Sequence, residues 1–286
     1  MSARLALRMT LAVAAASLSV SAHADSAVDC AQAADPAQVV AGCTAVLDSG
    51  DWSGTSAAWA YYNRANAYGD LGDTDAAFAD YDRATALDPY YTDAYNNRGV
   101  LNAGLGRNEE AIADYSAAIR ADPDNALAYF NRAIAHYTLG GYPDSIADYE
   151  AALAIAEGDP ATPADDVAAY REGLASAQND YAWDLYVTDS RLGEALKLVE
   201  LALAVLPDRP EYLDTRAHIL NAQGHAGAAV VSFEAAMAAG GADIVQIYED
   251  ALAGHGYDPG AVDGSYDAAM RAALKACVRD RCRLVE

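Results

Sequence analysis

The chain has 286 residues and a 53% hydrophobic composition, which is enough to form a substantial core and excludes a wholly disordered protein. Its 18 basic and 42 acidic residues give a net charge of −24, so most of its surface would repel a phosphate backbone or an anionic lipid surface. We therefore expect neither nucleic acid as a partner nor insertion into a membrane.

The first 24 residues have the pattern of a secretory signal peptide. Arg4 and Arg8 precede an apolar run, Met9 to Val20, that is too short to span a bilayer. Ala22-His23-Ala24 then supplies the small residues that signal peptidase requires. We predict cleavage after Ala24 and a periplasmic location, and an ordinary N-terminal helix is the alternative.

All four cysteines follow this segment, so an exported chain would carry them into an oxidising compartment. They lie as two local pairs near the two ends of the sequence, which favours Cys30 with Cys43 and Cys277 with Cys282 among the three possible pairings. Residues 25–54 are predicted to form an N-terminal helical cap. Closing so short a loop by the first disulfide would stabilise the cap by about 3 kcal/mol.

A period of 34 residues organises residues 55–242, and after an insertion of 16 residues the same columns return around Arg216. One looser unit lies between, which makes five repeats. The repeated positions are Asn63, Asn97 and Asn131; Arg64, Arg98 and Arg132; Ala65, Gly99 and Ala133; Gly72, Gly106 and Gly140; Asp80, Asp114 and Asp148.

Each repeat is predicted to be a pair of antiparallel helices. In the first repeat, apolar and small residues recur at helical spacing on both sides of Gly72, with Asp73 or Thr74 placed to start the second helix. This arrangement of small residues, aromatics and a terminal proline resembles the tetratricopeptide repeat (TPR) family. The resemblance implies an all-α, TPR-like α-solenoid, a right-handed superhelix of about five helical hairpins. It also implies a concave groove that binds a peptide or protein.

The insertion, Glu157 to Asp166, is predicted to be a surface loop that leads into a longer first helix of the fourth repeat. Residues 243–286 then depart from the repeat, and we expect helices near 243–253 and 268–274 around a Gly-Tyr-Asp-Pro-Gly loop. This segment resembles a small helical peptidoglycan-binding domain. The resemblance implies wall-binding positions at Tyr257, Asp258, Asp263, Tyr266 and Arg271.

The segment also departs from that family, with Asp267, Met270, Cys277 and Val278 at positions where the family has other residues. Its five basic residues after residue 270 would suit either a wall polymer with carboxylates or docking on the acidic repeats. If Cys277 pairs with Cys282, the last helix must end near Cys277 or Val278. The chain must then turn back and hold its basic end against the loop from Tyr257 to Gly264.

No catalytic motif stands out. The histidines after residue 24 lack the spacing of a metalloprotease helix, no serine lies in a nucleophile elbow, and the carboxylates are scattered. We therefore predict a protein that is not an enzyme, with no catalytic residues, no metal site and no cofactor.

The first helices of the repeats carry the candidate peptide groove. Side-chain amides suit the backbone of an extended peptide, and a purely structural role for them is the alternative. The groove candidates are Tyr62, Asn63, Asn66, Asn96, Asn97, Phe130, Asn131 and Ile134. Because Tyr62, Leu127 and Asn131 stand where related grooves carry a basic clamp, we expect no preference for a C-terminal carboxylate.

The arginine column is expected to pair with the aspartates of the second helices rather than to bind anions. These observations predict a periplasmic interaction protein that binds a protein or peptide partner, with a tail that tethers it to peptidoglycan. The alternatives are an envelope-structural protein whose tail only caps the solenoid, and a regulatory subunit of, or an enzyme acting on, the cell wall.

Overall fold

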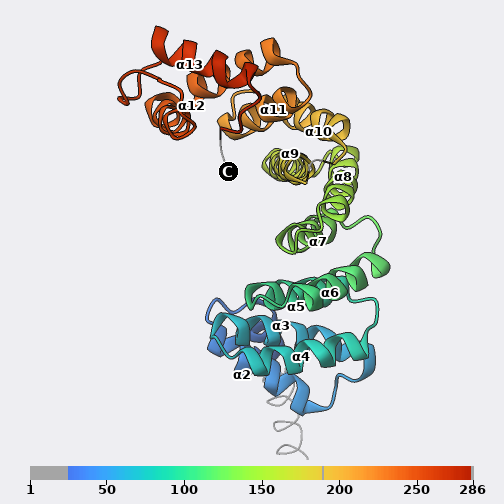
Figure 1. The fold of residues 1–286 in the computed structure, drawn as a ribbon. Helices are drawn as coiled ribbons and strands as arrows, with labels where there is room; N and C mark the ends of the chain where they lie inside the picture. The colour runs from blue at the N-terminus through green and yellow to red at the C-terminus, as the bar shows by residue number, and fades with distance from the viewer. Residues whose placement is uncertain (1–24, 189, 285–286) are drawn as a thin grey trace, which may run out of the picture. The chain divides into compact units, whose positions relative to one another are not determined.

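A computed structural model describes residues 25–188 and 190–284, so the predicted signal peptide lies outside the described residues. This part of the chain is helical and contains no strand (Figure 1). It divides into two compact units, one up to Ala135 and one from His136. The division falls within α7 (Ala126–Thr138) and differs from the predicted segment boundaries, which stay predictions.

Unit 1 begins with the predicted helical cap. Residues 25–32 are helical, and α2 (Pro36–Ser49) follows, with Asp35 Oδ1 accepting from the Ala37 amide at 3.0 Å. The buried Cys30 and Cys43 form a disulfide with their Cα atoms 4.5 Å apart, as predicted. Helix α2 packs on α3, so the cap covers the start of the repeats.

The repeats of unit 1 are helix pairs, in which α3 packs on α4 and α5 on α6. Gly72 and Gly106 lie in the turns with φ of 77° and 74°, a backbone conformation that favours glycine. Asp73, one of the two predicted caps, accepts from the Ala76 amide. The helices are η1 (Gly54–Ala57), α3 (Ala58–Asp70), α4 (Thr74–Leu87), α5 (Thr92–Gly104) and α6 (Asn108–Ala121).

Close approach of the paired helices depends on small side chains. Ala65, Ala77 and Ala84 are fully buried where α3 meets α4. In the second pair, a Cβ atom added at Gly99 would lie 2.6 Å from the Tyr115 ring, well inside van der Waals contact. The Tyr115 ring therefore occupies the space that a side chain at position 99 would need.

Unit 2 continues the helical pattern. The predicted long first helix of the fourth repeat is confirmed, since α9 has 24 residues, but the loop before it covers only residues 159–163. The predicted loop of 157–166 was therefore too long, because helical structure continues to Gly158 and resumes at Ala164. The helices are α8 (Tyr142–Gly158), α9 (Ala164–Val187), α10 (Leu192–Val205), α11 (Pro210–Ala222), α12 (Ala226–Gly254) and α13 (Ala268–Arg279).

Helix α12 joins the last repeat to the tail. Among the described residues it is the one helix long and apolar enough to cross a membrane by length and composition. Gly241 bends it, with φ of 71° and ψ of −159°, so neither half reaches the roughly 20 residues that a span needs. Both halves contribute buried side chains to the core of unit 2.

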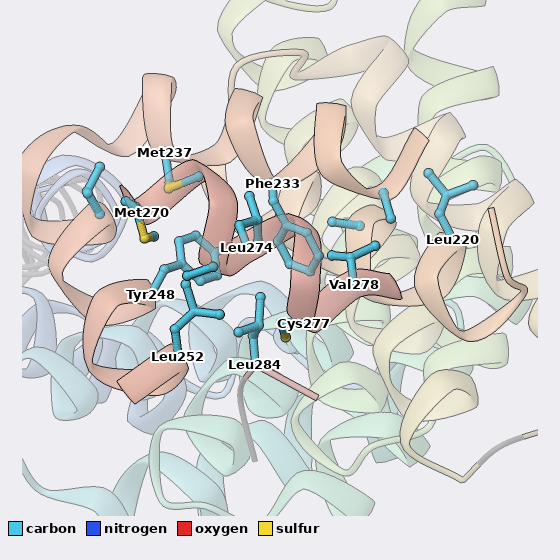
Figure 2. Close-up of a cluster of buried hydrophobic side chains, with 14 residues drawn as sticks. Leu220, Phe233, Met237, Tyr248, Leu252, Met270, Leu274, Cys277, Val278 and Leu284 are labelled. Atoms are coloured by element: carbon cyan, nitrogen blue, oxygen red, sulfur yellow. The ribbon is translucent and has the colours of Figure 1, made fainter. Parts of the chain in front are cut away.

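The tail and the last repeat share this core (Figure 2). Phe233 and Met237 from the first half of α12 meet Tyr248 and Leu252 from its second half. Helix α13 adds the buried residues Met270, Leu274, Cys277 and Val278. The tail is therefore packed as part of unit 2.

The arginine column pairs with the aspartate column inside the helix pairs of unit 1. Arg64 Nε lies 2.6 Å from Asp80 Oδ2, and Arg98 Nη2 lies 2.5 Å from Asp114 Oδ1. Arg98 Nη1 also reaches Asp82 of the preceding repeat at 2.6 Å. Both Asp80 and Asp114 are buried, so each pair connects helices through a charge that solvent does not screen well.

The last repeat keeps the arginine but replaces the carboxylate. Arg216 Nε donates to Ser232 Oγ at 3.0 Å, at the position that corresponds to the aspartates. Arg132 likewise donates to Ser116 of the preceding repeat at 2.9 Å. The predicted pairing with an aspartate is therefore confirmed for Arg64 and Arg98, whereas Arg216 contacts a serine, and we call these arginine contacts within and between repeats the brace.

We expect Arg98→Ala and Asp114→Ala each to lower the free energy of unfolding by about 2 kcal/mol, since each leaves a partly buried charge without its partner. The double variant should cost less than the sum of the two single effects. Urea unfolding of the four proteins measures this coupling. Arg120→Ala, at an exposed position on α6, is the control and should be additive with Asp114→Ala. Strict additivity of Arg98 with both Asp82 and Asp114 would contradict the brace.

Candidate functional site

Polar side chains of α3, α4 and α5 form a hydrogen-bond network in unit 1. Asn97 Nδ2 donates to Tyr62 Oη and to Asn66 Oδ1, both at 3.1 Å, and Tyr81 donates to the same Asn66 oxygen at 2.5 Å. Burial is the main cause that raises the pKa of Tyr81 above its ordinary range, so this hydroxyl stays a neutral donor. The network brings together three of the predicted groove residues.

Two hollows lie over this network, and we call them together the unit 1 groove. Their volumes are about 180 and 330 Å³, and Asn66 and Asp70 line both. Asn63 lines the first hollow beside the helical cap, whereas Asn97, Tyr81 and Val100 line the second. The groove is therefore mainly uncharged, with amides, one phenol and one carboxylate.

The remaining predicted groove residues lie on α5 and α7. Asn131 Nδ2 donates to Asn96 Oδ1 at 3.0 Å, and Asn96 is only 6% exposed. Asn96 lines neither of the two hollows of the unit 1 groove, so its place in the groove stays a prediction. Ile134 is exposed and Phe130 is partly buried. The asparagines thus join neighbouring helices as well as facing the groove.

The predicted wall-binding residues of the tail mostly contact other parts of the tail. Asp258 and Asp263 each accept a backbone amide two residues further on, from Gly260 and Ser265, at 3.0 Å. Tyr257 donates to Asp280 Oδ2 at 3.2 Å. These contacts shape the loop between α12 and α13.

Tyr266 and Arg271 meet on one carboxylate of the last repeat. Glu234 Oε1 accepts from the Tyr266 hydroxyl at 2.6 Å and lies 2.8 Å from Arg271 Nε. The hydrogen bond from Tyr266 is the main cause that lowers the pKa of Glu234, and Arg271 adds to it. This contact matches the alternative in which the basic tail docks on the acidic repeats.

Cys277 and Cys282 are joined, with Cα atoms 5.1 Å apart, and α13 ends at Arg279, close to the predicted place. The amides of Arg281 and Cys282 donate back to the carbonyls of Val278 and Cys277 at 3.1 and 3.0 Å. Arg281 has φ of 56°, the left-handed residue of a Schellman motif. The disulfide thus connects the two positions that this motif brings together.

The sequence analysis expects the basic end to lie against the loop from Tyr257 to Gly264. In the structure, Arg281 and Arg283 lie elsewhere. Arg281 lies against Gly224 in the turn before α12, and the Arg283 guanidinium lies 5.7 Å from the centre of the Tyr186 ring. The reason is the reversal at Arg281 and the burial of Leu284 in the core of unit 2. Asp280 contacts the loop through Tyr257, and Arg279 donates to the same carboxylate at 3.1 Å.

The sequence analysis missed a hollow in unit 2, which we call the unit 2 pocket. Its volume is about 290 Å³. It is lined by Asn179, Asp180 and Trp183 from α9; Pro210, Glu211, Asp214 and Thr215 from α11; and Ile244, Ile247 and Tyr248 from α12. The helical spacing of Ile244, Ile247 and Tyr248 is the sequence signal that points to this face.

Below this pocket lies a buried histidine. His218 is 1% exposed and packs among Trp183, Tyr186 and Phe233, and burial lowers its pKa. Asp214 accepts from the Tyr248 hydroxyl and lies 3.5 Å from His218 Nε2. This arrangement contains no nucleophile next to a base. Among residues 25–188 and 190–284, no cluster of His, Cys, Asp or Glu is placed to hold a metal ion.

Comparison with protein-family models gives two matches, a tetratricopeptide repeat at residues 58–91 and a TPR repeat at residues 103–140. A comparison with curated protein sequences gives no significant match. Among solved structures, YrrB, a TPR protein, is 17% identical with a TM-score of 0.50, and the similarity covers 69% of this chain and 91% of that one. The MamA protein is 16% identical with a TM-score of 0.48, covering 69% of this chain and 94% of that one. The predicted fold class, an all-α TPR-like solenoid, is confirmed.

We expect Glu234→Gln to destabilise the protein at pH 7 by less than about 1 kcal/mol, because the carboxylate is partly exposed. Because the pKa of Glu234 is lowered, its contact stabilises the folded protein fully at pH values above the ordinary pKa of a glutamate, about 4.3. This stabilisation is lost as the pH falls through the lowered pKa. Unfolding curves at pH 7, 5, 4 and 3 should therefore show the difference from wild type shrinking with acid. Glu200→Gln, exposed on α10, is the control. A difference that does not depend on pH would contradict a charged Glu234 in this contact.

Proposed function

We propose that this protein is a periplasmic interaction protein, not an enzyme, that binds an extended peptide segment of a protein partner in the unit 1 groove. The observation that carries this proposal is the network of Asn66, Asn97 and Tyr81 beneath two adjoining hollows. Amides held in fixed positions are suited to backbone N–H and C=O groups, whose pattern does not depend on the peptide sequence.

The charge of the groove supports an internal peptide segment rather than a chain terminus. Asp70 lines both hollows, and no lysine or arginine lines either of them among the described residues. A terminal carboxylate would therefore meet a carboxylate and no counter-charge. YrrB, which shares this fold, is described as a TPR protein with an unusual peptide-binding site.

The periplasmic part of the proposal rests on the signal-peptide pattern and on the two cysteine pairs, which are typical of an exported protein. Tethering to peptidoglycan rests on the tail's resemblance alone. The tail's contacts favour the alternative role as a cap, because Tyr266 and Arg271 bind Glu234 and α13 fills the core beside Phe233.

We expect Asn97→Ala to weaken binding of a peptide about tenfold, since Asn97 links α5 to Tyr62 and Asn66 of α3. The probe is a peptide selected on the purified protein from a display library, and affinity is measured by calorimetry. Amidation of its C-terminal carboxylate should leave the affinity nearly unchanged. Glu110→Ala, exposed on α6, is the control. A large loss on amidation, or equal affinity for Asn97→Ala, would contradict the proposed groove.

The wall-binding hypothesis predicts that the processed protein, with an N-terminus at Asp25, sediments with purified sacculi. Tyr257→Ala should then reduce sedimentation, because Tyr257 is the predicted wall-binding residue that contacts Asp280 beside the disulfide. Mass spectrometry of the protein from periplasmic extracts gives its N-terminus. If the protein stays in the supernatant with and without reductant, the tail acts as a cap and the tether is wrong.

A further inference from the structure

We propose that the unit 2 pocket binds a basic side chain, preferably arginine, presented by a peptide or protein partner. This inference rests on the proposed function as a peptide-binding protein, but it assigns a second site on helices that unit 1 does not contain. The pocket combines an apolar wall, a set of carboxylates that no lysine or arginine of the described chain contacts, and a buried acceptor without a hydrogen bond. Each of these features favours a cation on an aliphatic stem.

The apolar wall suits the methylene groups of a long side chain. Trp183, Ile244, Ile247 and Tyr248 line one hollow of about 290 Å³ together with Pro210. Ile247 is 53% exposed, although Val245, Tyr248 and Leu252 of the same helix half are buried in the core. An arginine stem packed on Ile247 and Trp183 would remove this apolar surface from water.

The polar lining is acidic. Asp180, Glu211 and Asp214 border the pocket, and within residues 25–188 and 190–284 no lysine or arginine lines it. Their side-chain contacts within the described chain are to neutral donors, namely Tyr137 and Asn179 for Asp180 and Tyr248 for Asp214. His218, the only titratable base beside Asp214, is buried and has a lowered pKa, so it leaves the negative charge in place.

Asn179 gives an independent indication of a ligand. Its side chain is 94% buried, its Nδ2 donates to Asp180 Oδ1 at 3.1 Å, and its Oδ1 has no hydrogen-bond partner. A buried acceptor without a donor is rare in folded proteins and costly. A guanidinium supplies several N–H donors in one plane, which serves Asn179 and a neighbouring carboxylate together.

Charge also distinguishes between the possible occupants of the unit 2 pocket. A second copy of this chain carries the same net charge of −24, so its acidic surface would be repelled by the pocket. A partner segment with basic residues would instead be attracted over a distance of about 10 Å at ordinary ionic strength. The occupant we assign is therefore a basic segment of a different protein.

The three tryptophans of the chain provide a direct test, because Trp183 lines the pocket whereas Trp52 and Trp59 pack against each other in unit 1. Protein labelled with 5-fluorotryptophan is titrated with Ac-Ala-Ala-Arg-Ala-Ala-NH₂ and followed by ¹⁹F NMR. The matched probes carry lysine, norleucine or glutamate at the central position. We expect the Trp183 signal alone to shift, with the arginine probe binding at least about tenfold more tightly than norleucine.

Two variants test the polar lining. Glu211→Gln removes an exposed carboxylate without a side-chain contact and should weaken the arginine probe about fivefold. Asn179→Leu removes the unpaired acceptor and should weaken the probe without lowering the midpoint of thermal unfolding. The control, Glu200→Gln on α10, makes the same charge change outside the pocket.

Equal binding of norleucine and arginine, or equal effects of Glu211→Gln and Glu200→Gln, would overturn the pocket assignment. So would a Trp183 signal that does not respond to the arginine probe in the folded protein.

The proposed function of the unit 1 groove is tested separately, since Asn97→Ala affects unit 1. Loss of peptide affinity in Asn97→Ala with a silent Trp183 would retain the unit 1 groove and reject the unit 2 pocket. A responsive Trp183 with an unaffected Asn97→Ala would do the reverse.

Discussion

Helices in this chain approach one another on alanine and glycine, and the positions of the larger side chains follow from that close approach. Ala65, Ala77 and Ala84 leave no space between α3 and α4 for a large residue. The tyrosines fill the spaces beside these contacts, and the short distance between helices lets one arginine reach an aspartate of its own pair and the preceding repeat. A bulkier residue in these columns would therefore disturb packing and charge pairing together.

Much of this fold was predictable because its determinants recur along the sequence. The glycine at 72 and the Arg98–Asp114 pair appear where the period places them. The lengths of irregular segments were less predictable, since the loop before α9 depends on how far α8 continues beyond its repeat. Asn96 illustrates another limit, because the sequence shows a polar residue but not that it is buried and accepts a hydrogen bond from Asn131.

The two candidate sites differ in how much of them the sequence reveals. The unit 1 groove includes Asn63, Asn97 and Tyr81, which stand in repeat columns and could be identified from the period. The unit 2 pocket draws on the loosest repeat, the last repeat and a helix beyond the repeats. No single column connects Asn179 with Ile247, and only the bend at Gly241 brings their helices to one hollow.

The last repeat and the tail share one core, so the residue at which the repeat pattern ends is not a suitable place to shorten the chain. The first half of α12 presents Phe233 and Met237 to a core that contains Tyr248 and Leu252 beyond the bend and buried residues of α13. A chain shortened at residue 242 would leave these side chains on a solvent-facing helix, which is a surface prone to aggregation. Such a shortened chain would need polar residues at both positions, so the sequence of the last repeat is suited to a chain that carries the tail.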